Sequence, residues 1–113
     1  MSISFNDSGE VRTIMITGRL DVDGTNSVAT QLVELSQAPK KGVVVDLSTL
    51  KFLASIGIRA LITSAKAVKA RGGKMVLVVN SGSTVMMSIQ ATGVDQFVPV
   101  FGSESDAERA ALA

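Results

Sequence analysis

The sequence contains no histidine, cysteine, tryptophan or tyrosine. Zinc, haem and iron–sulfur sites therefore lose their usual ligands, and a disulfide framework and Ser–His or Cys–His nucleophilic catalysis are excluded. An excess of charge of one sign is also lacking, because 11 basic and 10 acidic residues leave a formal net charge of +1. A strongly basic chain would favour nucleic acid, and this balance does not. We therefore expect no metal, no cofactor and no nucleic-acid partner.

Long apolar runs are missing as well. The longest stretches, such as Met75–Val79, are far too short to span a bilayer, and Met1–Asp7 lacks the basic start of a signal peptide. The chain has 113 residues, of which 46% are hydrophobic and 19% are charged, as in ordinary globular proteins. This composition predicts one soluble, cytoplasmic domain without a membrane partner.

Short apolar segments rich in β-branched residues alternate with segments of helical periodicity. Continuous apolar runs such as Val43–Leu47 are typical of strands buried on both faces of a parallel sheet. The patterns predict five strands, at Ile3–Phe5, Val11–Thr17, Val43–Leu47, Met75–Val79 and Phe97–Phe101. They predict four helices, at Thr25–Gln37, Ile56–Arg71, Ser83–Thr92 and Ala107–Leu112. An N-terminal hairpin followed by β-α units implies an α/β fold with a mostly parallel mixed sheet.

The loops at the carboxyl ends of the strands hold the candidate functional residues, because ligands of open α/β sheets bind there. Asp21 and Asp23 have the chemistry for acid–base or magnesium work, although such residues commonly form turns and helix N-caps. Asn80–Ser83 precedes a helix whose N-terminus would suit a phosphate, yet no glycine-rich nucleotide motif accompanies it. An N-cap role for Ser81 or Ser83 is the simpler interpretation.

The loop from Asp46 to Ile58 is the most informative of these. Ser55 falls at or near the N-cap of the longest predicted helix, where its hydroxyl lies among free backbone N–H groups. A capping role alone would contribute about 1 kcal/mol to stability. Gly57 in a first helical turn costs roughly 1 kcal/mol relative to alanine, which indicates that something approaches the backbone closely there.

Several segments combine in a recognisable order: GRLD at Gly18–Asp21, VVVDLS at Val43–Ser48, Phe52, Ser55-x-Gly57-Ile58, KMVLVVN at Lys74–Asn80 and TGVDQFVPVF at Thr92–Phe101. Together they resemble a STAS domain, specifically one of the bacterial anti-sigma factor antagonist family. The resemblance covers nearly the whole chain. It implies a single STAS-like domain over residues 1–113, with about five strands and about four helices.

The resemblance also implies a phosphorylation switch. The family signature at the start of this helix is Asp-Ser-Ser/Thr-Gly, and its first serine is phosphorylated by a partner serine kinase that doubles as the anti-sigma factor. Ser55 and Gly57 match the signature, whereas Ala54 and Ile56 replace the Asp and the second Ser/Thr. The implied phosphate acceptor is Ser55, and a serine phosphatase is a further implied partner. The implied partner-binding residues are Asp21, Ser55, Ile56, Gly57 and Arg59.

Two other functions stay open at this point. STAS-like domains also serve as subunits of transporters or scaffolds without a phosphorylation cycle, and the replacements at Ala54 and Ile56 keep this alternative open. A small metal-dependent enzyme using Asp21, Asp23 or Asp46 is the third, but convergent site groups are lacking. We therefore expect a regulatory protein that is not an enzyme. A homodimer remains open, as does whether Met86 and Met87 face a partner or fill gaps in the core.

Overall fold

The computed structural model describes residues 2–113. The strands are β1 (Ser2–Ser8), β2 (Val11–Leu20), β3 (Gly42–Asp46), β4 (Leu50–Leu53), β5 (Lys74–Val78) and β6 (Val100–Phe101). The helices are α1 (Val22–Ser36), α2 (Ser55–Ala70), α3 (Thr84–Thr92), the 3-10 turn η1 (Val94–Gln96) and α4 (Glu104–Leu112). Among the helices of this described range, none has the length and apolar character needed to cross a bilayer.

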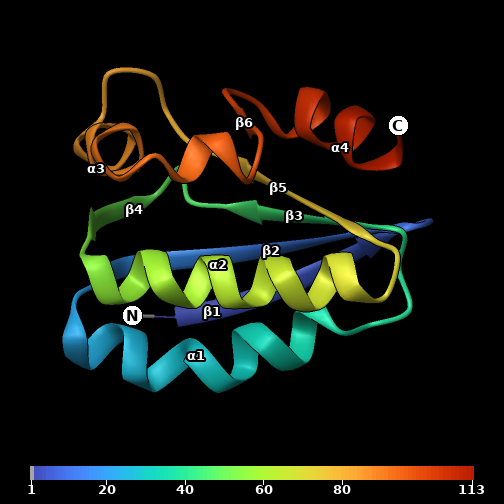
Figure 1. Cartoon of the computed structure of the whole chain (residues 1–113), viewed down its shortest axis with the longest axis horizontal. Coiled ribbons are helices and arrows are strands. Elements are labelled where there is room, and N and C mark those ends of the chain that lie inside the picture. The colour runs from blue at the N-terminus through green and yellow to red at the C-terminus, as the bar shows by residue number, and fades with distance from the viewer. Residues whose placement is uncertain (1) are drawn as a thin grey trace.

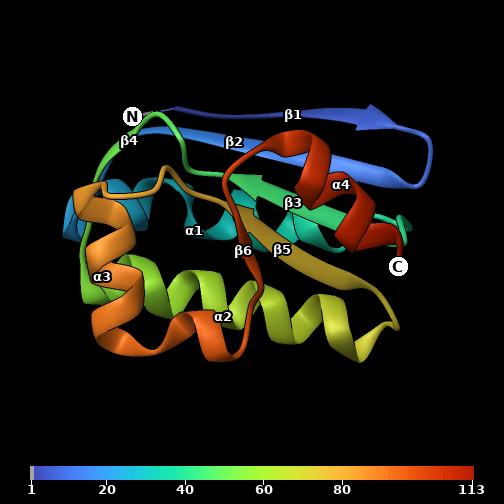
Figure 2. The ribbon, with the colours of Figure 1, turned by 90° about the horizontal axis from the view of Figure 1, so that it is seen from above.

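The strands form one sheet in the order β1-β2-β3-β5-β6, with β4 added alongside the end of β2 (Figures 1 and 2). β1 and β2 form the antiparallel N-terminal hairpin, and the other pairs are parallel. The predicted α/β fold with a mostly parallel mixed sheet is therefore confirmed.

Two details of the predicted strands were wrong. The sheet has six strands instead of five, because Leu50–Leu53 pairs with Gly18–Leu20 where a loop was expected. Four residues are too few to show a strand period, so only their pairing with β2 makes them a strand. The predicted strand Phe97–Phe101 shrinks to Val100–Phe101, since Pro99 has no N–H to donate to a ladder.

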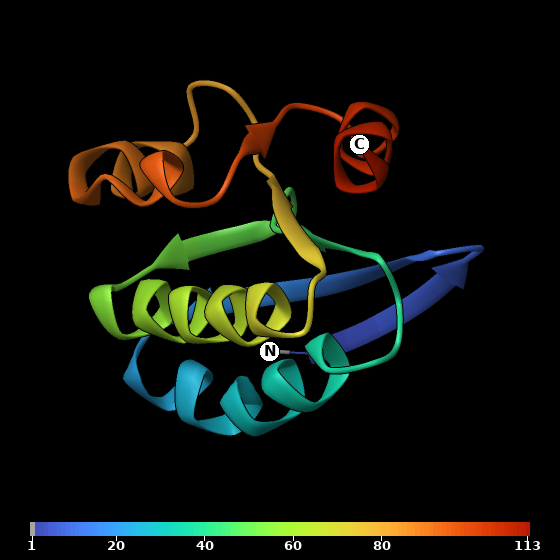
Figure 3. The same ribbon diagram turned by 45° about the vertical axis from the view of Figure 1, so that its right-hand side comes forward.

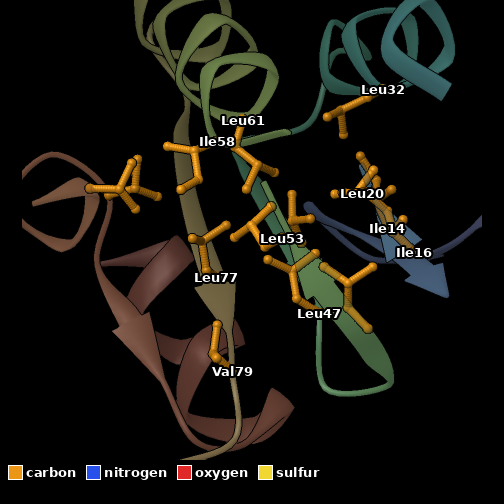
Figure 4. Packing of buried hydrophobic residues seen from close by; sticks show 14 of the residues in the cluster. Ile14, Ile16, Leu20, Leu32, Leu47, Leu53, Ile58, Leu61, Leu77 and Val79 are labelled. Atoms are coloured by element: carbon orange, nitrogen blue, oxygen red, sulfur yellow. The ribbon is translucent and has the colours of Figure 1, made fainter. Parts of the chain in front are cut away.

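Two layers of helices cover the sheet. α1 and α2 lie side by side against one face, and α4 covers the other face over β3 and β5 (Figures 1 and 3). Alternating residues of β3 divide between these layers: Val43 and Val45 pack under α1 and α2, whereas Val44 packs under α4. Figure 4 shows the larger cluster, in which leucine and isoleucine side chains from both helices meet those of the sheet. Each fully buried side chain of this size contributes roughly 1.5–3 kcal/mol.

Candidate functional site

Ser55 is the first residue of α2 and is exposed to solvent. The N-cap is the preceding residue, Ala54, whose extended backbone (φ −88°, ψ 168°) leads into the helix and whose methyl group offers no capping hydrogen bond. Ser55 therefore lies next to the cap, as expected, but does not occupy it. Ser55 is therefore not a helix cap in this structure.

The end of β2 holds this segment in place. The N–H of Ala54 donates to the carbonyl of Leu20 at 2.9 Å, and β4 pairs with the last residues of β2 immediately before it. Gly57 lies against the same strand end, where a Cβ would stand 2.9 Å from the Leu20 Cβ and 3.1 Å from its carbonyl oxygen. The close approach inferred from the glycine is thus to Leu20, and it brings α2 down onto the sheet.

The first turn of α2 presents free backbone N–H groups, the positive end of the helix dipole, beside Ser55. A helix leaves its first four N–H groups without intrahelical partners, and within residues 2–113 only the Ala54 N–H has a partner elsewhere, the Leu20 carbonyl of β2. The first turn contains no acidic residue. Arg59 is exposed one turn further along, and within residues 2–113 it forms no ion pair. An anion attached to Ser55 would therefore meet favourable charge from both the helix dipole and the guanidinium.

Asp21 lies at the same end of the molecule as Ser55. Leu20 and Ala54, the residues immediately before them, are joined by a backbone hydrogen bond. Figure 1 shows α1 and α2 beginning side by side there. Asp21 is the N-cap of α1, with Oδ1 accepting from the Gly24 N–H at 2.8 Å, so its capping interpretation holds. Its other oxygen lies 3.8 Å from Nε of Arg19, whose guanidinium is 4.6 Å above the Phe52 ring.

The remaining predicted partner-binding residues divide into two groups. Ile56 and Arg59 line a shallow groove of about 230 Å³ between α1 and α2. Gly57 is buried against the end of β2, where it positions the helix. Two apolar residues near the starts of the same helices are exposed: Val22, which no pattern marked, and Phe52, which was noted only as part of the family resemblance. The signal that the sequence offered for Phe52 was an aromatic residue within a predicted loop.

No metal-dependent site is assembled from the acidic residues of the described range. Residues 2–113 contain no group of three or more acidic side chains placed to hold a metal ion. Asp21 caps a helix and Asp23 is exposed in the first turn of α1. Asp46 is buried at the end of β3, and its Oδ1 accepts from the Ser48 N–H at 2.8 Å.

Asp46 and Glu104 form a carboxyl pair that the sequence did not reveal. The hydrogen bond to Asp46, together with burial and the charges of Asp46 and Glu108, raises the pKa of Glu104 to about 7. Burial works to raise the pKa of Asp46, but its hydrogen bonds to Glu104 and Ser48 keep it below the ordinary value. Glu104 therefore holds a proton more readily than Asp46 does, and the pair connects the start of α4 with the end of β3.

Comparison with known proteins identifies the family of this domain. The family model described as the STAS domain matches residues 2–107. The chain belongs to the STAS domain family. The match covers both the Ser55 segment and the Asp46–Glu104 pair. Among curated proteins, none matches the sequence.

Solved structures show how widely this STAS domain fold is used. An anti-sigma factor antagonist from Mycobacterium paratuberculosis is similar over 99% of this chain and 94% of its own, with 21% identity and a TM-score of 0.88. The phosphorylated form of the Bacillus cell fate determinant SpoIIAA is similar over 96% of this chain and 99% of its own, with 17% identity and a TM-score of 0.68. The murine anion transporter Slc26a9 is similar over 95% of this chain but only 18% of its own, with 20% identity and a TM-score of 0.77. At these identities the likeness establishes the fold of the STAS domain.

Proposed function

We propose that this STAS domain is an anti-sigma factor antagonist that binds an anti-sigma factor serine kinase while Ser55 is unmodified and is released when Ser55 is phosphorylated. The observation that carries the proposal is the position of Ser55, exposed as the first residue of α2 with a hydroxyl that caps nothing. The similar antagonist structures support the class of partner. A serine phosphatase would restore the binding form. The regulatory role needs no catalytic group in this chain.

The local structure suits a phosphate at Ser55. In the transfer, Ser55 Oγ attacks the γ-phosphorus of the kinase's ATP, its proton passes to a base of the kinase, and ADP leaves. The phosphate adds about −1.5 to −2 charge at pH 7. The free N–H groups of the first turn and Arg59, four residues further along the helix, compensate that charge. The fold therefore tolerates the modification, and its effect falls on partner binding.

The partner surface in this proposal surrounds Ser55. Ile56 and Arg59 contribute one side through the groove between α1 and α2. Asp21, with Arg19 stacked on the half-exposed Phe52, contributes the other. An anion placed in the middle of an apolar and hydrogen-bonded interface would have to be desolvated or repelled, at a cost of several kcal/mol. Phosphorylation would thereby separate the two proteins.

Phosphopeptide mapping after incubation with a serine kinase encoded near this chain's gene tests the proposal. We expect stoichiometric modification at Ser55, and release of the kinase in a pull-down of the modified protein. The Ser55→Ala variant should bind the kinase and accept no phosphate. Modification at Ser48 or Thr49 with Ser55 unchanged would refute the switch.

A second function has a specific observation in its favour. The similarity to the STAS portion of an anion transporter shows that the same fold occurs inside a much longer membrane protein. Ala54 and Ile56, which depart from the antagonist signature, fit a subunit of a transporter or scaffold complex without a phosphorylation cycle. Co-purification with transport proteins, unaffected by Ser55→Asp, would favour this function over the switch.

A further inference from the structure

One side of β5 is only half paired. β6 joins it at Leu77 and Val78 alone, so no strand within residues 2–113 pairs with Lys74–Val76 on that side. The N–H groups of Leu77 and Val79 donate to the carbonyls of Pro99 and Phe101, each at 2.9 Å. Because backbone directions alternate along a strand, the N–H and carbonyl of Met75 point to the same edge. In Figure 2 this first half of β5 continues beyond β6, between the end of α2 and α4.

A trough runs beside this unpaired half. It consists of two adjoining hollows of about 410 and 450 Å³ that share Ala65, Lys69, Phe97 and Val98 as lining residues. The first is bounded by α2, and the second continues past Gly72 and Gly73 to Met75 and Pro99. Neither glycine has a side chain, and a Cβ at Gly72 would meet nothing within 4 Å. The trough therefore gives an extended chain access to the sheet edge.

The wall of the trough contains an unusually exposed aromatic side chain. Phe97 is 78% exposed, although its neighbour Val98 is buried in the core. Ile62 and Ala65 of α2 lie on the opposite side and are partly buried. An apolar side chain of a bound segment would find an aromatic and an aliphatic surface here, which is the usual composition of an anchoring pocket.

The charged side chains along the trough all have one sign. Lys66, Lys69 and Lys74 line it, and no aspartate or glutamate does. None of the three lysines forms an ion pair with any residue from 2 to 113. α2 itself contains no acidic residue over its whole length, Ser55–Ala70. Charge complementarity therefore selects an acidic occupant.

We propose that the unpaired half of β5 and the adjoining trough bind an extended, acidic segment of a partner protein, which adds to the sheet as a short strand. Main-chain bonds to Met75 would supply part of the affinity, as in other cases of strand addition. Alternating side chains would place aliphatic groups against Phe97 and carboxylates near the lysines. This surface lies at the opposite end of α2 from Ser55, so the STAS domain would hold a second partner independently of its proposed phosphorylation state.

Selection from a random peptide library displayed on phage tests this proposal. The full chain is the target, and the Lys66→Glu/Lys69→Glu variant is used to remove peptides that bind elsewhere. We expect enriched peptides in which acidic and aliphatic residues alternate. A synthetic copy should shift the NMR amide signals of Lys74–Val78 and Phe97–Phe101, and bind the double variant at least about tenfold more weakly. Lys51→Glu, an exposed single charge reversal on β4, should leave binding unchanged.

Further measurements separate the possible occupants. N-methylation of the peptide at the residue facing Met75 should weaken binding about five- to tenfold, because it removes one main-chain hydrogen bond. Ser55→Asp should bind the peptide like the wild type, so the result is independent of the proposed switch. Enriched peptides without acidic residues, or insensitive to the lysine variants or to N-methylation, would overturn the proposal. The proposal would also be overturned if the trough bound a fatty acid such as laurate in preference to the peptide. Dimerisation of the chain through this edge in sedimentation experiments would overturn it as well.

Discussion

Gly57 of α2 packs so closely against Leu20 of β2 that a side chain at position 57 would clash: a Cβ on Gly57 would lie 2.9 Å from the Leu20 Cβ. This contact, with the hydrogen bond from Ala54 to Leu20, sets the height of α2 above the sheet and hence the position of Ser55. The helix accepts glycine in its first turn because the packing requires it.

Gly57→Ala should therefore lower the free energy of unfolding by about 1–2 kcal/mol, since the crowding outweighs the roughly 1 kcal/mol that alanine gains in helix propensity. Urea unfolding measures the change. Gly102→Ala is the matched control, because a Cβ there would meet nothing within 4 Å. A Gly57→Ala protein more stable than the wild type would show that the contact with Leu20 has no steric consequence.

Ala54→Asp should stabilise the domain by about 0.5–2 kcal/mol. Ala54 has the extended backbone of an N-cap but no side chain to accept from the first turn, and that turn contains no acidic residue. Thermal unfolding at low ionic strength tests this. Ala70→Asp places the same charge on the last residue of the same helix, where the dipole opposes it, and should lower stability. Equal effects of the two variants would contradict the assignment of the cap.

Ser55→Ala and Ser55→Asp should separate stability from partner binding. Because Ser55 is exposed and caps nothing, Ala should change the unfolding free energy by less than about 0.5 kcal/mol. Asp should stabilise slightly, since an acidic residue in the first turn interacts with the dipole. Calorimetric titration against the kinase should show binding by Ala and a loss of about 2 kcal/mol or more for Asp. Tight binding by Asp would exclude charge at Ser55 as the switch.

The Asp46–Glu104 pair should make stability fall as the pH rises from about 4.5 to 7. The pKa of Glu104 is raised from 4.5 to about 7. The stability gained from protonated Glu104 is therefore fully present below pH 4.5, the pKa of the unfolded chain, and is lost as the pH rises through 7. No histidine titrates in this window, because the sequence has none. Unfolding free energies measured between pH 5 and 8 should decline for the wild type but stay level for Glu104→Gln. Parallel slopes for both proteins would refute the raised pKa of Glu104.

Ser64→Ala should raise the unfolding free energy by about 1 kcal/mol. Ser64 in α2 is fully buried, and its hydroxyl has no hydrogen-bond partner among residues 2–113. Ser36 is the matched control, because it is equally buried but donates to the carbonyl of Leu32 at 2.6 Å. Ser36→Ala should bring no gain in a parallel urea titration. A destabilised Ser64→Ala protein would indicate that the hydroxyl is satisfied after all.

Local sequence was sufficient for most of the elements and for the neighbourhood of Ser55. The apolar run Val43–Leu47 and the helical stripe after Ile58 specify a buried strand followed by a long helix, and Ser55, three residues before Ile58, falls near the helix start. Periodicity reports on burial one element at a time, so these features follow without knowledge of their neighbours. Gly57 likewise indicated a close contact, but the sequence did not show that the contacting residue is Leu20.

The tertiary structure decided which elements meet. Only the fold brings Leu50–Leu53 beside the end of β2, Gly57 onto Leu20, and Glu104 to Asp46. The last two residues are far apart in sequence, and neither carries a local pattern that marks the other. The pairing of Asp46 with Glu104, cation stacking on Phe52 and the half-paired edge of β5 all depend on distances between separate elements. Local periodicity carries no information about such distances, because they are set by how the helices and strands pack together.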